Sequence, residues 1–105
     1  MGKMKITIEI KNALNSNKLI VAELEASSKE CSRWLGIYSI ESGYRVRTFE
    51  LPNQYIENDY DVDESDLVNS KDYYVNGLDE LQSLLENEFN QTIILTCPWK
   101  TDYPL

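Results

Sequence analysis

Residues 31–51 read CSRWLGIYSIESGYRVRTFEL, and this stretch decides the fold because it contains two strand-like segments joined by a turn. In its first half, Trp34 and Tyr38 fall on one face of an extended chain. Leu35 and Ile37 fall on the opposite face. Apolar side chains on both faces are typical of a strand that is covered on both sides. The first half therefore predicts a central strand.

A tight turn follows this strand at Glu41-Ser42-Gly43. Gly43 can adopt the positive φ that short hairpin turns require. Residues 44–51 predict the next antiparallel strand, and Pro52 ends it because proline cannot donate a hydrogen bond to the ladder.

Further strands are expected on either side of this hairpin. Residues 4–11 alternate Met or Ile with Lys, Thr or Glu, which indicates a strand with one face on a core and the other in water. Residues 12–17, with three Asn and one Ser, predict a turn, and residues 18–26 predict a second strand. A last strand is expected over residues 91–97, where Pro98 closes it.

One amphipathic helix is predicted over about residues 77–90. Asn76 is a favourable N-cap, and Asp79 and Glu80 would complement the helix dipole in the first turn. The apolar side chains recur at helical spacing and would form one stripe facing the sheet: Leu78, Leu81, Leu84, Leu85 and Phe89. We therefore expect a single α+β domain, residues 1–105, with this helix packed on a mainly antiparallel sheet of five to six strands.

Charge is distributed very unevenly along the chain. Residues 1–49 carry eight basic and five acidic side chains, whereas residues 50–88 carry one basic and twelve acidic side chains, a net charge of −11. The net charge of the whole chain is −8. Such a field repels nucleic acid and anionic membranes and attracts basic proteins. It favours a protein that blocks a basic partner, although acidic loops also serve simply to keep small proteins soluble.

The residue content disfavours several kinds of chemistry. The chain has no histidine, the commonest general base and metal ligand, and its four glycines form no phosphate-binding loop. Asp59, Asp61 and Asp63 fit the first ligand positions of an EF-hand loop, but Glu64 replaces the required Gly and Ser70 replaces the final Glu. We therefore expect a protein that is not an enzyme and has no catalytic residues, cofactor or metal site.

A cytoplasmic protein that binds neither nucleic acid nor a membrane is expected. Its apolar runs, residues 19–22 and 93–95, are too short for a transmembrane span, and its N-terminus lacks a signal-peptide pattern. Cys31 and Cys97 are far apart in the sequence, and we expect them to be reduced and packed as small apolar side chains.

The candidate partner-binding site lies in residues 53–71. We predict a long acidic loop here, with a short strand near residues 66–70 and another at residues 72–75. Tyrosines alternate with carboxylates in this stretch, and tyrosines are frequent interface anchors whereas carboxylates steer a basic partner. The residues expected to bind the partner are Tyr55, Glu57, Asp59, Tyr60, Asp61, Asp63, Glu64 and Asp66.

Residues 74–85, YVNGLDELQSLL, carry the strand-to-helix motif G-[LV]-D-x-L-Q-x-L, and the middle strand with Trp34, Gly36 and Ile37 adds to the match. In these residues the chain resembles small acidic immunity proteins of bacterial contact-dependent growth inhibition and related polymorphic toxin systems. The resemblance implies a protein that binds the C-terminal domain of a cognate toxin, a basic RNase or DNase, as a monomer in a 1:1 heterocomplex. The motif is structural, so it transfers no functional residue.

Two other functions fit the same residues. A DNA-mimic inhibitor of a DNA-binding protein would present regularly spaced surface carboxylates to several such proteins. A general acidic protein-interaction module would use the same surface without inhibiting its partner. In the immunity reading, the acidic, Tyr-containing surface covers the active site of the toxin, and its carboxylates stand where the substrate phosphates would stand.

Overall fold

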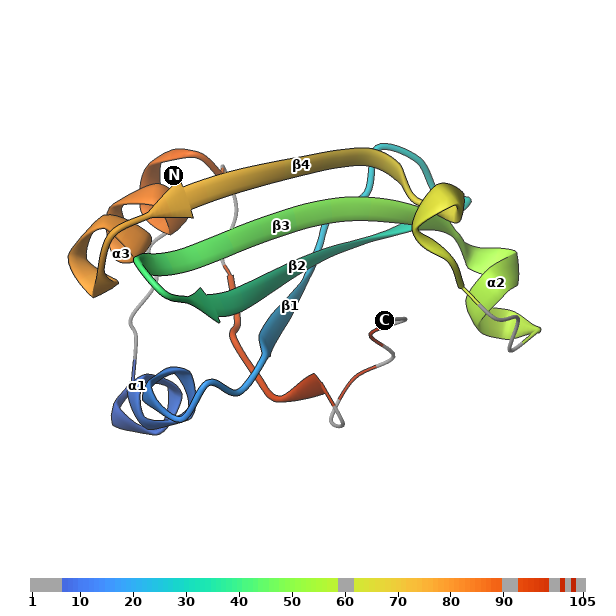
Figure 1. The fold of residues 1–105 in the computed structure, drawn as a ribbon. Helices are drawn as coiled ribbons and strands as arrows, with labels where there is room; N and C mark the ends of the chain where they lie inside the picture. The colour runs from blue at the N-terminus through green and yellow to red at the C-terminus, as the bar shows by residue number, and fades with distance from the viewer. Residues whose placement is uncertain (1–6, 59–61, 90–92, 99–100, 102, 104–105) are drawn as a thin grey trace.

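The structure, a computed structural model, describes residues 7–58, 62–89, 93–98, 101 and 103 (Figure 1). In chain order its elements are α1 (Ile8–Asn15), β1 (Ile20–Leu24), β2 (Cys31–Ile40), β3 (Gly43–Pro52), α2 (Asn53–Glu57), the 3₁₀ turn η1 (Glu64–Asp66), β4 (Val68–Val75) and α3 (Leu78–Asn87). The predicted α+β class is confirmed. Within the described residues the sheet has four strands, so the expected number of five to six was too high.

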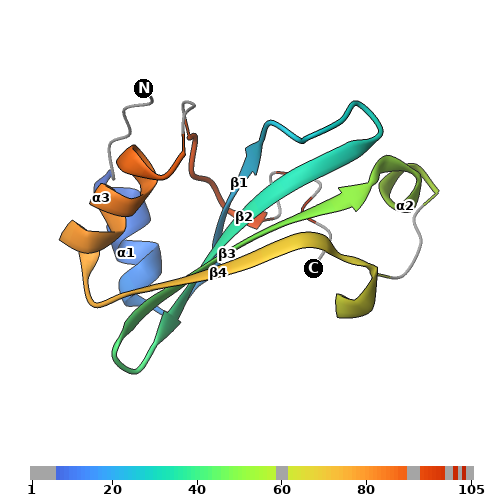
Figure 2. The same cartoon turned by 90° about the horizontal axis from the view of Figure 1, so that it is seen from above.

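The sheet is an antiparallel meander with the strand order β1-β2-β3-β4. The long hairpin of β2 and β3 forms its centre, with Trp34 opposite Phe49 (Figure 2). Gly43 closes the hairpin with a φ of 147°. A Cβ atom on this residue would collide with the carbonyl oxygen of Val75 in β4. The predicted hairpin is therefore confirmed, and its glycine is required both by its φ and by the closeness of β4.

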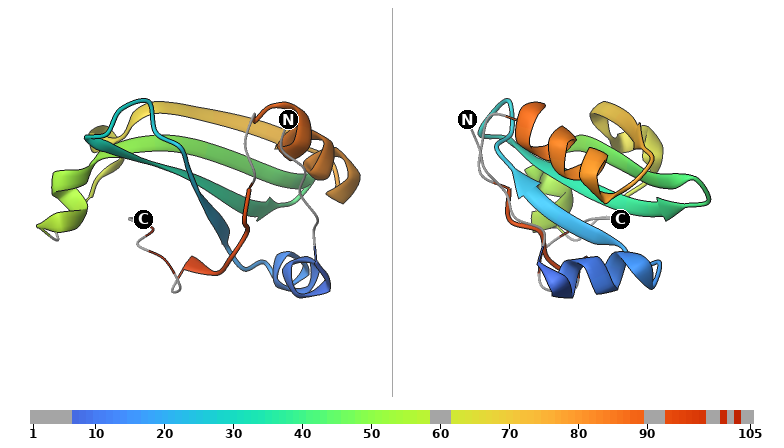
Figure 3. Two further views of the ribbon diagram at one scale, coloured as in Figure 1. Left: turned by 180° about the vertical axis from the view of Figure 1, so that it is seen from behind. Right: turned by 90° about the vertical axis from the view of Figure 1, so that its left-hand side faces the viewer.

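The main core lies between one face of the sheet and the two helices α1 and α3. Ile20, Leu35 and Val46 are fully buried on this face, and Leu14 of α1 and Leu81 of α3 pack into the same cluster. Both helices lie at one end of the sheet, whereas α2 lies at the opposite end (Figures 1 and 3). The α2 end of the sheet therefore lies away from the helices that close this core.

Helix α3 carries the predicted apolar stripe. Leu81 and Leu85 are buried, and Phe89, just beyond the helix, packs its ring edge-on against Tyr73 with centroids 6.0 Å apart. These contacts confirm the helix and the direction in which it faces. The remaining stripe residues, Leu78 and Leu84, are half-buried.

The N-terminal end of α3 differs in one detail from the prediction. The N-cap position is Gly77 and not Asn76, so the cap residue has no side chain that could bond to the helix. Instead, the Glu80 carboxylate accepts a hydrogen bond of 2.7 Å from the backbone N–H of Asn76. A carboxylate in the first turn thus fixes the chain that enters the helix.

The strand predicted over residues 4–11 was wrong. Residues 4–6 lie outside the described residues, and α1 begins at Ile8 after Thr7, whose hydroxyl accepts a 3.3 Å hydrogen bond from the N–H of Ile10. Ile8 is 77% exposed, whereas Ile10 and the residues three and four positions later pack against the core, as a helix requires. The predicted turn over residues 12–17 is consequently the end of this helix, and Asn17, with a φ of 59°, completes it.

Two further strand predictions also need correction. The segments predicted near residues 66–70 and at residues 72–75 form one strand, β4, so residues 53–71 contain α2, η1 and the first half of β4 rather than one long loop. The predicted last strand, residues 91–97, is described only from Ile93 onward. There it makes a single antiparallel bridge, in which Val21 and Thr96 exchange two hydrogen bonds of 2.9 Å.

The second face of the sheet is covered by a tyrosine from the C-terminal end. The ring of Tyr103 lies edge-on to Trp34 and tilted against Phe49, with centroids 5.8 and 5.7 Å away. Its hydroxyl shares a 2.8 Å hydrogen bond with the hydroxyl of Tyr38, and Gly36 leaves the space that this hydroxyl occupies. Burial, together with the hydrogen bond to Tyr38, raises the pKa of Tyr103 above the ordinary value of 10.0.

Replacing Tyr103 tests whether this cover contributes to stability. We expect Tyr103→Ala to lower the free energy of unfolding by about 2–4 kcal/mol, because it uncovers Trp34 and Phe49. Tyr103→Phe should cost only about 1 kcal/mol, since it removes one hydrogen bond. Urea unfolding followed by tryptophan fluorescence measures both. Tyr74→Ala is the control, because Tyr74 is 67% exposed; an equal loss in this variant would contradict the assignment.

Candidate functional site

The predicted site residues form a small acidic lobe at the end of the sheet opposite α1 and α3. We define the acidic lobe as residues 53–66, of which residues 53–58 and 62–66 are described. Its described parts are α2, residues 62 and 63, and η1 (Figures 1 and 2). The lobe follows the C-terminal end of β3, at the open end of the β2–β3 hairpin, which places its surface away from the main core.

Asn53 attaches the acidic lobe to the connection between β1 and β2. Its backbone N–H donates a 2.8 Å hydrogen bond to the carbonyl oxygen of Glu30, and its side-chain amide donates one of 3.0 Å to that of Lys29. The hydroxyl of Ser32 donates to the Asn53 side-chain oxygen. A single polar side chain thus joins three parts of the chain, which fixes the direction in which α2 leaves the sheet.

Asp66 holds the two halves of the acidic lobe together. One of its carboxylate oxygens accepts a 3.2 Å hydrogen bond from the hydroxyl of Tyr55, and the other accepts one of 2.9 Å from the backbone N–H of Asp63. Both Tyr55 and Asp66 are half-buried. These two predicted partner-binding residues therefore serve to order the lobe.

The structure places the other predicted residues as follows. Glu57, at the end of α2, and Asp63, before η1, are exposed on the surface of the lobe. Glu64 is the first residue of η1. The three remaining residues lie outside the described part of the chain: Asp59, Tyr60 and Asp61. The structure thus brings together Tyr55, Asp63 and Asp66.

Glu50 is a buried carboxylate beside the lobe that the sequence analysis did not single out. It accepts hydrogen bonds from the backbone N–H and the hydroxyl of Ser27, at 2.9 and 2.7 Å, and from the side-chain amide of Asn69, at 3.0 Å. Burial disfavours the charged form, but these hydrogen bonds and the nearby Arg33 outweigh it and lower the pKa of Glu50. Strand periodicity places Glu50 on the same face as Val46, which is the core face. A carboxylate on the core face of a predicted strand is the signal in the sequence that could have identified Glu50.

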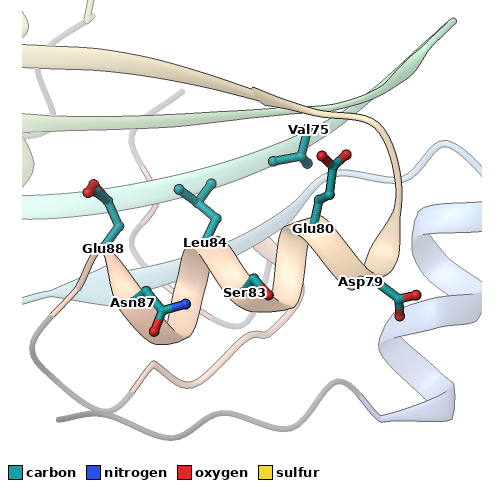
Figure 4. Close-up of a pocket in the computed structure, with 7 residues that line it drawn as sticks. All are labelled: Val75, Asp79, Glu80, Ser83, Leu84, Asn87 and Glu88. Carbon is teal, nitrogen blue, oxygen red and sulfur yellow. The ribbon is translucent and has the colours of Figure 1, made fainter.

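A second acidic surface lies along α3. An open groove of about 520 Å³ runs between this helix and the end of β4 (Figure 4). Val75 and Leu84 are its apolar members, and the rest of its lining is polar: Asp79, Glu80, Ser83, Asn87 and Glu88. The sequence analysis used Asp79 and Glu80 only to support the helix start, because the closeness of β4 to this side of the helix is not visible in the sequence.

The described residues contain no group of three or more His, Cys, Asp or Glu side chains that could hold a metal ion. None of the helices described is long and apolar enough to cross a membrane.

A comparison with protein families, curated proteins and solved structures finds no match to this chain. The functional argument consequently rests on the residues and their geometry.

Glu50 gives a prediction about the pH dependence of stability. Its pKa is lower in the folded protein than the ordinary value of 4.5, so the ionised form stabilises the fold above that value, and the stabilisation is lost as the pH falls through the lowered pKa. Glu50→Gln should therefore lower the free energy of unfolding by about 1–2 kcal/mol at pH 7 and by much less at pH 3. Urea denaturation at both pH values measures the difference. Glu41→Gln, at an exposed position in the hairpin turn, is the control; a Glu50→Gln effect of equal size at both pH values would contradict the proposal.

Proposed function

We propose that this protein is an immunity protein, which binds a basic nuclease toxin and inhibits it by covering its active site. The observation that carries the proposal is the set of hydrogen bonds among the described residues of the acidic lobe. Tyr55 and Asp66 bond to each other, and this contact fixes the chain on which Glu57 and Asp63 are exposed. Surface carboxylates held on an ordered frame bind a partner at a lower entropic cost than carboxylates on a disordered tail.

The charge of the chain supports a basic partner. Residues 50–88 hold a net charge of −11, and the lobe lies at one end of this stretch. Negative charge of this size accelerates encounter with a basic surface and repels nucleic acid. A nuclease is the basic partner that best fits this field, because its substrate groove is built to bind phosphates.

Inhibition of this kind requires no chemistry from the inhibitor. Exposed carboxylates such as Glu57 and Asp63 would occupy the positions of substrate phosphates and bond to the same Lys and Arg side chains. Substrate and inhibitor then compete for one groove. We propose a 1:1 complex of two monomers in the cytoplasm, where a nuclease toxin would reach its substrate.

The partner is identified by affinity capture from native lysate at low and moderate salt, followed by mass spectrometry. A single stoichiometric basic protein with RNase or DNase activity is the expected result. The activity of that protein is then measured with and without one equivalent of the captured inhibitor. Capture of many DNA-binding proteins, with binding that fades as salt rises, would instead support the DNA-mimic alternative.

Charge reversal in the acidic lobe tests the mode of inhibition. We expect the double variant Glu57→Lys/Asp63→Lys to weaken binding to the captured nuclease by about 30-fold, because each reversal removes an ion pair of about 1 kcal/mol. Isothermal titration calorimetry and a nucleic-acid cleavage assay measure the loss. Glu41→Lys, an exposed reversal far from the lobe in sequence, should bind like the wild type.

Two results would contradict this assignment. Equal weakening by Glu41→Lys would mean that only the net charge matters. Protection that is lost only in a core variant such as Leu81→Asp, and not in the lobe variant, would move the binding site away from the lobe.

A further inference from the structure

The outer edge of β4 is a second surface with the features of a binding site. β4 is the end strand of the sheet, and no strand in the described part of the chain pairs with its outer side. In Figures 1 and 2 no described strand lies along this side of β4. An edge strand presents unpaired backbone N–H and C=O groups, which can pair with an added strand.

The first half of this edge is protected against strand addition. The register shifts between Thr48 and Glu50 on the neighbouring strand, and Asn69 has a φ of 52°, so the strand bulges there. Lys71 adds a positive charge, and bulges and lysines are the devices by which natural edges avoid unwanted pairing. Residues 72–75 carry neither device and pair regularly with β3. The accessible part of the edge is therefore its C-terminal half.

Helix α3 lies beside this half of the edge and turns one row of side chains toward it. Glu80, Leu84 and Glu88 project toward β4 in Figure 4, and Val75 lies near Glu80 and Leu84. These three side chains are four residues apart, so they are spaced by roughly 6 Å along the helix axis. Leu84 and Val75 form an apolar floor with one carboxylate at each end. Glu80 uses one oxygen to accept the N–H of Asn76.

The spacing of this row matches the repeat of an extended chain. Side chains on one face of a strand are separated by two residues, or roughly 6.6–6.8 Å. A strand added beside the end of β4 would pass next to α3, because the helix and Val75 line one groove in Figure 4. Three successive side chains on its inner face would then meet Glu80, Leu84 and Glu88. The carboxylates of Glu80 and Glu88 favour a basic residue at each end of the segment, and Leu84 favours an apolar residue between them.

We infer that residues 72–75 of β4 and the row Glu80, Leu84 and Glu88 form a docking surface for an extended basic segment of a partner protein. The segment adds to the sheet as a fifth strand and has the pattern basic–x–apolar–x–basic. The charge complementarity that identifies this occupant comes from Glu80 and Glu88, and the apolar anchor comes from Leu84 and Val75. That the partner is the basic toxin rests on the proposed function. The pattern of the segment rests only on the residues of the groove and of β4.

The test uses two synthetic peptides of identical composition, both acetylated and amidated. The matched peptide, Thr-Lys-Thr-Val-Thr-Lys-Thr, places both lysines on the same face as the valine. The mismatched peptide, Thr-Thr-Lys-Val-Lys-Thr-Thr, places them on the opposite face. Each is titrated into ¹⁵N-labelled protein, and amide shifts and hydrogen exchange are recorded by NMR.

The matched peptide should shift the amides of residues 72–75 and Leu84, and should slow hydrogen exchange at the β4 edge. It should bind about 30-fold more tightly than the mismatched peptide, because two exposed ion pairs distinguish them. Equal affinity of the two peptides, or shifts confined to the acidic lobe, would overturn the inference.

A pair of variants separates the groove from general electrostatics. Glu88→Lys should weaken binding of the matched peptide by about fivefold, whereas Glu23→Lys, an exposed reversal on β1 at the opposite edge of the sheet, should leave it unchanged. Equal weakening by both variants would overturn the inference. These measurements use no toxin. A failure of peptide binding therefore leaves toxin inhibition untouched, and a failure of toxin inhibition leaves the peptide result untouched.

Discussion

The rest of the structure depends on the β2–β3 hairpin, because this hairpin carries large apolar side chains on both of its faces. Leu35 and Val46 face one way, and Trp34 and Phe49 face the other, and all four are buried. A four-stranded sheet cannot bury both faces by itself, so each face needs a separate cover. Helices α1 and α3 cover the first, and Tyr103 packs on the second.

The two covers use different interactions. The helix face is closed by aliphatic packing, in which Leu81 and Leu85 contribute from α3. The second face is closed in part by aromatic contacts and by the hydrogen bond between Tyr38 and Tyr103. The helices leave the far end of the sheet uncovered, and the acidic lobe occupies that end. Acidic surface is therefore present at both ends of one rigid sheet, on the lobe and along α3.

The sequence predicted the parts of the fold that have a clear local period. The hairpin and the α3 stripe were correct because alternation and helical spacing are direct consequences of strand and helix geometry. The N-terminal helix was missed because Ile8 and Ile10 also alternate, and the cap formed by Thr7 is a weaker signal than that alternation. The number of strands was too high because the chain from Ile8 forms helix α1 where a strand was expected, and because the stretch after α3 makes only a single bridge.

The candidate site was predictable in composition but not in arrangement. The run of carboxylates and tyrosines marked the acidic lobe, yet the bond between Tyr55 and Asp66 joins residues 11 apart that only the fold brings together. Glu50 and Ser27 are 23 residues apart, and α3 and the end of β4 form the groove only because the chain reverses between them. Such contacts depend on tertiary structure, which local patterns do not encode.

The contact between Tyr38 and Tyr103 spans 65 residues of sequence. During synthesis the β2–β3 hairpin therefore leaves the ribosome long before the residue that covers its second face. In that interval Trp34 and Phe49 are exposed on a nascent sheet with an open edge, a species to which chaperones bind and from which aggregates grow. The order in which the chain is made thus sets a period of vulnerability, and its length depends on the rate of translation.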